Sequence, residues 1–286
     1  MPGSCVIEFD RVFKQYWLGK TQTLAGIVSA NMRRVFCNGQ PRQSQEEEGG
    51  ASRASLSAVR DMSFAVGRGE SLGLIGRNGS GKTTLLKLIN RVTWPTSGAV
   101  RTQGRIISLL ELGAGFHGEL SARDNIYLSG AIFGLTRKEV QARFDEIVEF
   151  AEIERFVDTP IKRFSSGMFA RLGFSAAIHS DPDIVLVDEV LSVGDEAFQR
   201  KALDKLSVLV KGGATLILVS HDMRVIQQVC QRAMWMGNGT IMALGEAGEI
   251  MARYGEQIQA EIHRNASERP WASAPGATVL SEALER

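Results

Sequence analysis

The sequence predicts an α/β domain in which a buried parallel sheet is joined to an inserted helical segment. Two short, continuous apolar runs, Ile184–Val187 and Thr215–Val219, have the length and composition of strands that are buried on both faces. Upstream of these runs, residues 121–178 carry apolar side chains at helical spacing. Strand, loop, helix and strand in this order are typical of α/β domains.

The N-terminal part of the chain predicts a strand followed by a polar stretch. Residues 5–17 alternate apolar and polar side chains, as a half-buried strand does, and end in the aromatic pair Tyr16 and Trp17. Residues 24–37 fit a short amphipathic helix that could contact a partner, although plain surface or core packing explains them equally well. Residues 38–55 are polar and glycine-rich, which favours a mobile loop.

Two more strands are predicted before the first helix. Ser63–Val66 and Ser71–Ile75 have the composition of short strands, and Arg68–Glu70 has that of the turn between them. A glycine-rich loop follows the second of these strands, and a helix is predicted through Thr84–Ile89.

The inserted segment carries a clear helix start. Thr136-Arg137-Lys138-Glu139 matches a capping box, in which threonine and glutamate each satisfy a backbone amide. One apolar stripe follows at helical spacing, formed by Val140, Phe144, Ile147, Val148 and Ala151. Residues 255–286 show no clear period and several small side chains, so we expect a loosely ordered C-terminal tail there.

Composition limits the function classes. The 286 residues suit one large domain, and 33 basic against 32 acidic side chains give a net charge of +1. This balance offers no electrostatic reason for nucleic acid as the main partner. Cys5, Cys37 and Cys230 are scattered and odd in number, which favours free thiols in a reducing cytosol over a disulfide framework.

The sequence predicts no targeting or spanning segment. Its first residues lack the basic start and apolar core of a secretory signal. No apolar run approaches the ~18 residues that a membrane-spanning helix needs. If the protein works at a membrane, we expect another polypeptide to span it.

The string from Gly76 to Thr83 predicts a phosphate-binding loop. Its three glycines let the backbone amides approach phosphate, and the helix that begins near Lys82 adds a positive dipole. Lys82 is expected to reach the β- and γ-phosphates, and Thr83 to bind Mg²⁺. The residues predicted to bind ATP here are Gly76, Arg77, Asn78, Gly79, Ser80, Gly81, Lys82, Thr83 and Thr84.

Polar side chains come at the ends of the two apolar runs. Asp188 ends the first run, where a buried carboxylate needs a partner, so we expect it to contact Mg²⁺ through water. Glu189 comes next and is the predicted general base for the attacking water. His221 follows the second run and is assigned to the γ-phosphate or its attacking water. Asp195 is a weaker nucleotide-binding candidate, because a turn alone explains an acidic residue there.

The turn Ser165-Ser166-Gly167 predicts a second phosphate grip. Serine hydroxyls can donate to phosphate, and the helix from Met168 to Ala177 offers a free N-terminus. An ordinary serine N-cap would explain one of these residues but not both small neighbours. Such a grip makes sense mainly for a nucleotide held by another copy of the protein. The turn therefore predicts an ATP-driven dimer.

Taken in this order, the phosphate loop, the serine-glycine turn, the Asp-Glu strand end and the histidine resemble the nucleotide-binding subunit of ABC transporters over residues 6–254. Three further strings narrow the resemblance, namely Leu110–His117 before Asp124–Tyr127, Phe164–Leu172 and Val190–Asp195. Together they are similar to the subunits that export lipid-linked O-antigen, capsular polysaccharide and teichoic acid.

This resemblance implies a fold and a domain organisation. The fold is the α/β P-loop NTPase fold, a RecA-like parallel sheet core with an antiparallel β edge and an inserted α-helical subdomain. The nucleotide-binding domain is expected over residues 1–254, with the helical subdomain at about 116–179, and the tail over residues 255–286.

The resemblance also implies how ATP is held. Tyr16, or its neighbour Trp17, would stack on adenine, although a tyrosine at a strand end could equally belong to the core. Two copies would enclose two ATP molecules. Each ATP would lie between one phosphate loop and the opposing Ser165–Gly167.

The chain departs from the wider family in two places. Its signature contains Ser-Ser-Gly-Met in place of Ser-Gly-Gly-Gln, and its loop near Glu111 lacks the usual glutamine that couples Mg²⁺ to the membrane subunit. Glu111 is our candidate for that coupling contact. Some members of the exporting group carry a C-terminal sugar-recognition domain, where about 100 residues is typical of such a sandwich. Residues 255–286 are too few, so we expect this subunit not to read the polymer itself.

The function implied is that of an ATPase bound to a multispanning permease, peripheral on the cytoplasmic face of the inner membrane. Its glycan substrate would be handled through the permease, with no nucleic acid involved. One alternative is a soluble ABC ATPase acting on ribosomes or DNA, but the chain has neither an internal repeat nor a sustained heptad run. Another is the ATPase of an importer or drug exporter, which shares all the chemistry.

Overall fold

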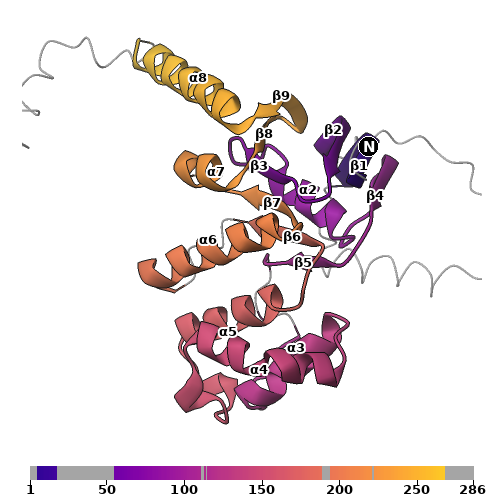
Figure 1. Ribbon diagram of the computed structural model, residues 1–286. Helices are drawn as coiled ribbons and strands as arrows, with labels where there is room; N and C mark the ends of the chain where they lie inside the picture. Colours follow the sequence, from indigo (N-terminus) through magenta and orange to yellow (C-terminus); the bar gives the residue numbers. More distant parts are fainter. Residues whose placement is uncertain are drawn as a thin grey trace, which may run out of the picture.

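The computed structural model describes residues 5–17, 55–110, 113, 115–188, 194–220 and 222–267. Two sheets form the upper part of the molecule in Figure 1, and a helical subdomain lies below them. The strands are β1 (Cys5–Trp17), β2 (Ser55–Gly67), β3 (Ser71–Ile75), β4 (Ser97–Thr102), β5 (Ile106–Ser108), β6 (Ile184–Asp188), β7 (Thr215–Val219), β8 (Arg232–Gly237) and β9 (Thr240–Glu246). The α-helices are α2 (Lys82–Ile89), α3 (Ala122–Ile132), α4 (Arg137–Ala151), α5 (Ser166–Ile178), α6 (Glu196–Lys211), α7 (Met223–Val229) and α8 (Ala247–Ser267).

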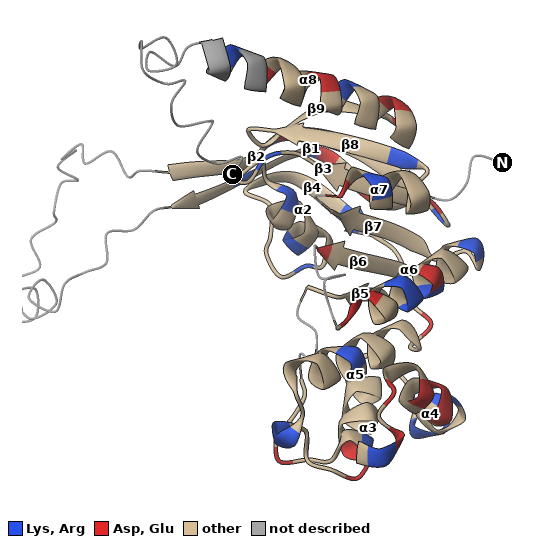
Figure 2. Cartoon of the chain, turned by 90° about the vertical axis from the view of Figure 1, so that its left-hand side faces the viewer, with Lys and Arg blue, Asp and Glu red and all other residues tan. Residues whose placement is uncertain are grey.

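The larger sheet has the order β5-β6-β7-β3-β8-β9. Its first five strands are parallel and β9 pairs antiparallel with β8. Every residue of β3 and β7 is buried, as their continuous apolar runs predict. Helix α2 lies on one side of this sheet, and α6 and α7 lie on the other (Figure 2). The carboxyl ends of β3, β6 and β7 therefore open towards the same edge.

The smaller sheet is antiparallel, with the order β2-β1-β4. Strand β1 has its predicted bounds, but β2 begins at Ser55 and not at Ser63. The extra residues pair with the outer end of β1, where Tyr16 lies opposite Leu56. Half of them are polar, and the buried Val59 and Met62 are separated by Arg60 and Asp61, so the strict alternation of a strand is broken and the pattern did not reveal this part of β2. Phe9 and Phe64 stack where the two strands face the core, with ring centroids 4.6 Å apart.

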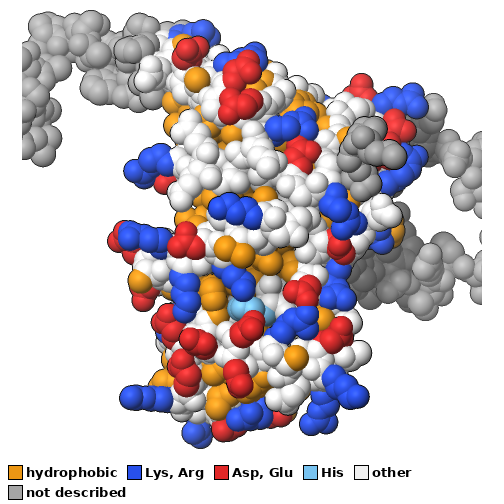
Figure 3. Space-filling view, in the orientation of Figure 1, with side chains coloured by type: hydrophobic (Ala, Val, Ile, Leu, Met, Phe, Trp, Pro, Cys, Tyr) orange, Lys and Arg blue, Asp and Glu red, His pale blue; other side chains and the backbone are white. Residues whose placement is uncertain are grey.

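The helical subdomain confirms the predicted capping box and apolar stripe. The Thr136 hydroxyl accepts a hydrogen bond from the Glu139 amide, and the Glu139 carboxylate accepts one from the Thr136 amide at 2.7 Å. All five residues of the stripe on α4 are buried in a separate apolar cluster with α3 and α5. Basic and acidic side chains are interspersed over the face drawn in Figure 3, in keeping with the near-zero net charge.

The expected loosely ordered tail from residue 255 is wrong for its first part, because helix α8 continues to Ser267. Ile250, Tyr254 and Ile258 recur every four residues on one side of this helix. The repeat begins before residue 255, so residues 255–286 taken alone show no clear period. Residues 268–286 lie outside the described residues, as do the predicted helix at 24–37 and the predicted loop except for Ser55. Within the described ranges, no helix is long and apolar enough to cross a membrane.

Candidate nucleotide site

The phosphate loop joins β3 to α2, and two of its glycines are required by close backbone contacts. Gly76 and Gly81 have φ angles of +145° and +105°, which side-chain-bearing residues rarely adopt. A Cβ atom at Gly76 would stand 2.2 Å from the carbonyl oxygen of Met236, and one at Gly81 would stand 2.4 Å from that of Ala58. Gly79 also has a positive φ, but a Cβ there would meet no atom within 4 Å. The loop backbone therefore packs closely against neighbouring backbone at Gly76 and Gly81, whereas the space beside Gly79 is open.

Lys82 occupies the inside of this loop. Its side chain is 6% exposed, and its Nζ donates to the carbonyl oxygens of Gly76 at 2.7 Å and Arg77 at 3.1 Å. A buried ammonium group needs polar partners, and these two hydrogen bonds hold the positive charge of Lys82 within the phosphate loop. The Ser80 hydroxyl is also buried here and has no hydrogen-bond partner among the described residues. The loop therefore offers an anion a positive charge, a free hydroxyl and the N-terminus of α2.

Two oxygen ligands meet beside the loop. The Thr83 hydroxyl donates to the Asp188 carboxylate at 3.3 Å, joining the first turn of α2 to the carboxyl end of β6. Hydroxyl and carboxylate oxygens are the ligand types that Mg²⁺ prefers. In the part of the chain that the structure describes, no group of three or more His, Cys, Asp or Glu side chains could hold a metal ion. A cation here would need further oxygens from phosphate and water, which fits a metal that arrives with a nucleotide.

Tyr16 lies at the other side of the loop. A cavity of about 370 Å³ is lined by Tyr16, by Leu56–Ala58 of β2, and by Asn78, Gly79 and Gly81–Thr84 of the loop and α2. The lining includes Tyr16 but not Trp17, whose side chain is 64% exposed. Lys14 places its Nζ 5.0 Å from the centre of the Tyr16 ring. This cavity brings the predicted adenine-stacking residue and the phosphate loop together; the stacking itself stays a prediction.

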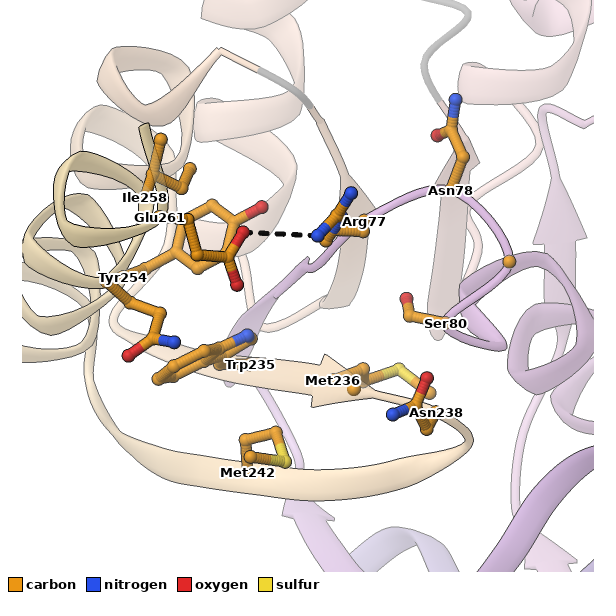
Figure 4. A pocket seen from close by; sticks show the side chains of 13 residues that line it. Arg77, Asn78, Ser80, Trp235, Met236, Asn238, Met242, Tyr254, Ile258 and Glu261 are labelled. Atoms are coloured by element: carbon orange, nitrogen blue, oxygen red, sulfur yellow. Dashed lines mark hydrogen bonds and ion pairs between the residues drawn. The ribbon is translucent and has the colours of Figure 1, made fainter. Parts of the chain in front are cut away.

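A second cavity, of about 440 Å³, borders the loop on its far side (Figure 4). Its floor is formed by Trp235, Met236 and Met242 of the β8–β9 hairpin, and its outer wall by α8. Arg77 points across it to Glu261, 3.1 Å away. The backbone of Arg77 thus belongs to the loop, as predicted, while its side chain is directed away from the first cavity. Sequence reasoning missed Glu261 because that residue was assigned to the tail.

The serine-glycine turn lies in the helical subdomain, away from α2 (Figure 1). Ser165 is the N-cap of α5, since its hydroxyl accepts from the Met168 amide at 3.2 Å. The alternative of an ordinary cap is therefore correct for Ser165 but does not account for Ser166 or Gly167. Both serines are exposed, and neither cavity beside the phosphate loop is lined by this turn. Within one chain, the structure does not bring the two predicted phosphate grips together.

An ion-pair network fixes the helix that presents this turn. Glu152, just after α4, accepts from Arg171 of α5 and from Lys201 of α6, each at 3.0 Å. The rings of Phe174 and Phe198 meet edge to face beneath it, 5.9 Å apart. Helix α5 is therefore tied to α6, which follows the Asp188 strand in the chain.

The remaining predicted site residues are only partly described. Asp195 is the N-cap of α6 and accepts from the Phe198 amide at 2.9 Å, so this turn role accounts for it without a nucleotide. Glu189, His221 and Glu111 lie outside the described residues, and their roles stay predictions. Next to His221, Asp222 caps α7, and hydrogen bonds from Arg224 lower the pKa of its carboxyl. Asp222 is thus an anion at neutral pH.

Comparison with known proteins identifies what the chain is similar to. Residues 59–192 match the family described as ABC transporter. The "O-antigen export system ATP-binding protein RfbB" of Klebsiella pneumoniae is 49% identical over 69% of this chain and 80% of its own length. The protein of the same name from Myxococcus xanthus is 43% identical, over 79% of this chain and 52% of its own length. A "Teichoic acids export ATP-binding protein TagH" from Enterococcus faecalis is 42% identical, over 72% of this chain and 45% of its own length. The chain spans about half the length of the last two relatives.

Solved structures agree on the fold. The "Structure of ATP binding subunit of ABC transporter" matches with a TM-score of 0.66 at 20% identity, covering 87% of this chain and 93% of its own. A dimeric, post-hydrolysis ATP-binding cassette bound to ADP and Pi matches with a TM-score of 0.64 at 20% identity, covering 84% of this chain and 98% of its own. These likenesses confirm the predicted α/β fold class.

Proposed function

This chain belongs to the ABC transporter family, and from that premise we propose that it is the ATP-hydrolysing subunit of an exporter of lipid-linked polysaccharide. The observation that carries the proposal is the geometry of the phosphate loop. Its backbone curves around the buried Lys82, and the Thr83 hydroxyl, at the start of the following helix, donates to the Asp188 carboxylate. The Lys82 ammonium, the buried Ser80 hydroxyl and the N-terminus of α2 are groups that bind phosphate in proteins, which supports a nucleotide as the ligand.

The residues present fit ATP with Mg²⁺. Loop amides, Lys82 and the Ser80 hydroxyl would hold the phosphates, Thr83 and Asp188 would hold the cation, and Tyr16 would carry the adenine. Bound Mg²⁺ would neutralise phosphate charge and orient the γ-phosphate for in-line attack by water. Lys82 would exchange its two carbonyl partners for phosphate oxygens, so that its charge acts in a site shielded from water.

The second phosphate grip is proposed to come from a second copy. Ser165 and Ser166 are exposed, at the N-terminus of a helix of 13 residues, and lie away from the loop of their own chain. A two-fold dimer would place them over the partner's open Gly79 region, completing two equal sites. ATP binding would then bring two subunits together and hydrolysis would release them, which turns binding energy into movement.

The transported substrate is proposed from the relatives' names, which specify O-antigen and teichoic acid export. We propose that the chain works with a multispanning permease at the cytoplasmic face of the membrane. The signature sequence Ser-Ser-Gly-Met fits the polysaccharide-exporting group and so favours a glycan exporter over an importer or drug exporter. A soluble ATPase that acts on ribosomes or DNA is disfavoured by the near-zero net charge and by the lack of an internal repeat or heptad run in the sequence.

Two experiments test the proposal. Replacing Glu189 with Gln should leave ATP binding intact, abolish turnover and trap a nucleotide-dependent dimer; Glu196→Gln, an exposed change at the start of α6, is the matched control. If Glu189→Gln hydrolyses ATP at the wild-type rate, Glu189 is not the general base. Purification of the tagged chain from membranes should recover a multispanning protein, whereas recovery with ribosomes or DNA would overturn the transport role.

A further inference from the structure

The second half of helix α8 lies across a cavity from the phosphate loop, and an ion pair between Glu261 and Arg77 joins the two. The first half of α8 is held firmly, because Ile250 and Met251 are buried and Tyr254 meets Trp235 edge to face at 5.5 Å. Beyond Tyr254 the helix leaves the core, and the residues from Gly255 to Glu261, together with Arg264, are half-buried or exposed. What approaches the loop is therefore the loosely held second half of α8.

The space between this half-helix and the loop is not filled by side chains. The second cavity, of about 440 Å³, separates Arg77, Asn78 and Ser80 on one side from Ile258 and Glu261 on the other (Figure 4). The Arg77–Glu261 ion pair crosses it. Because no packed core fills this gap, α8 can shift relative to the loop with little cost in contacts.

Arg77 is held at both its ends. Its guanidinium binds Glu261, and its carbonyl oxygen accepts from Lys82 Nζ at 3.1 Å. Among the described residues, Arg77 is thus bonded at its side chain to a carboxylate of α8 and at its backbone to the ammonium that would bind phosphate. A shift of Glu261 would therefore move Arg77, whose carbonyl oxygen is a hydrogen-bond partner of Lys82.

We infer that Glu261 is a positioning residue for the phosphate loop, acting through its ion pair with Arg77. This inference deepens the proposed function and rests on it. Glycine-rich loops lose much backbone freedom when they order, so a tether that restricts Arg77 favours nucleotide binding. The ion pair is exposed, with 79% of the Arg77 side chain accessible, so its effect is small, reversible and sensitive to salt. A contact with these properties adjusts the affinity for nucleotide without being required for binding.

The test compares nucleotide affinity in full-length variants, measured with a fluorescent ATP analogue. Glu261→Gln removes one charge at nearly constant shape and should weaken binding about two- to fivefold at low salt, with the melting temperature unchanged. The control, Glu256→Gln, makes the same change at an exposed position of α8 that does not line the cavity, and should bind like the wild type. Raising KCl should reduce the difference between the two variants.

A charge exchange makes the test specific to this pair. Arg77→Glu alone should weaken binding further, and Arg77→Glu combined with Glu261→Arg should recover part of the loss. Equal affinities of Glu261→Gln and Glu256→Gln, or no recovery in the exchanged pair, would overturn the inference while leaving the proposed function in place. A wild-type chain that binds no ATP analogue would refute the proposed function and the inference together.

Discussion

Ser165→Ala separates the two roles of the serine-glycine turn. The Ser165 hydroxyl caps α5 through the Met168 amide, and loss of such a cap costs about 1 kcal/mol. In a domain of this size that lowers the melting temperature by roughly 2–4 °C. If the same hydroxyl also donates to a phosphate of the partner's nucleotide, a charge-assisted hydrogen bond of about 1.5–3 kcal/mol is lost as well. Turnover should then fall roughly tenfold to 150-fold.

Ser121→Ala provides the matched control, because Ser121 caps α3 in the same subdomain by accepting from the Asp124 amide at 3.1 Å. Its melting temperature should fall by a similar amount, while steady-state ATP hydrolysis at saturating nucleotide stays near the wild-type rate. Both variants are compared by phosphate release and by nucleotide-dependent dimerisation in gel filtration. If Ser165→Ala hydrolyses ATP as fast as Ser121→Ala, the hydroxyl is only a cap and the second phosphate grip is refuted.

Three further outcomes are expected. Gly81→Ala should abolish binding of the ATP analogue, since a Cβ there would lie 2.4 Å from a carbonyl oxygen at a φ of +105°, while Gly255→Ala, with no atom within 4 Å, should bind normally. Hydrogen bonds from the capping threonine lower the pKa of Glu139, so the stabilisation by its carboxylate is present at neutral pH and is lost as pH falls through the folded pKa. Glu139→Gln should therefore flatten the fall in melting temperature below about pH 5. An unchanged slope would contradict this role of the Glu139 carboxylate. Burial raises the pKa of the Cys230 thiol to about 12, so a chain with Cys230 as its sole cysteine should react with a maleimide only after denaturation, whereas a chain with only the exposed Cys5 should react at once.

The buried strands and the phosphate loop could be predicted from the sequence because local patterns specify them. The apolar runs of β6 and β7 need burial on both faces, and the three glycines before Lys82 have few structural alternatives. The capping box of α4 is likewise complete within four residues. In each case the interactions that form the element lie close together in the chain.

Features that depend on distant contacts were not predicted. Strand β2 starts at Ser55 because β1 pairs with it, and α8 continues past residue 254 because β8 and β9 support its first half. Glu261 meets Arg77 across the second cavity, a contact 184 residues apart in the chain that no local pattern encodes. Asp195 caps α6, which matches the turn role that the sequence offered as the alternative, and its contact with nucleotide stays a prediction.

A mixing experiment tests most directly whether two copies share each nucleotide site. Lys82→Ala destroys the phosphate loop, and Gly167→Asp places a negative charge in the opposing turn, where a Cβ has room because its nearest neighbour is 3.9 Å away. Each variant alone should be inactive, while a mixed dimer holds one intact site built from the sound half of each chain. Random mixing should therefore restore ATP hydrolysis to about a quarter of the wild-type rate. A mixture as inactive as its components, or either variant fully active alone, would contradict the shared site.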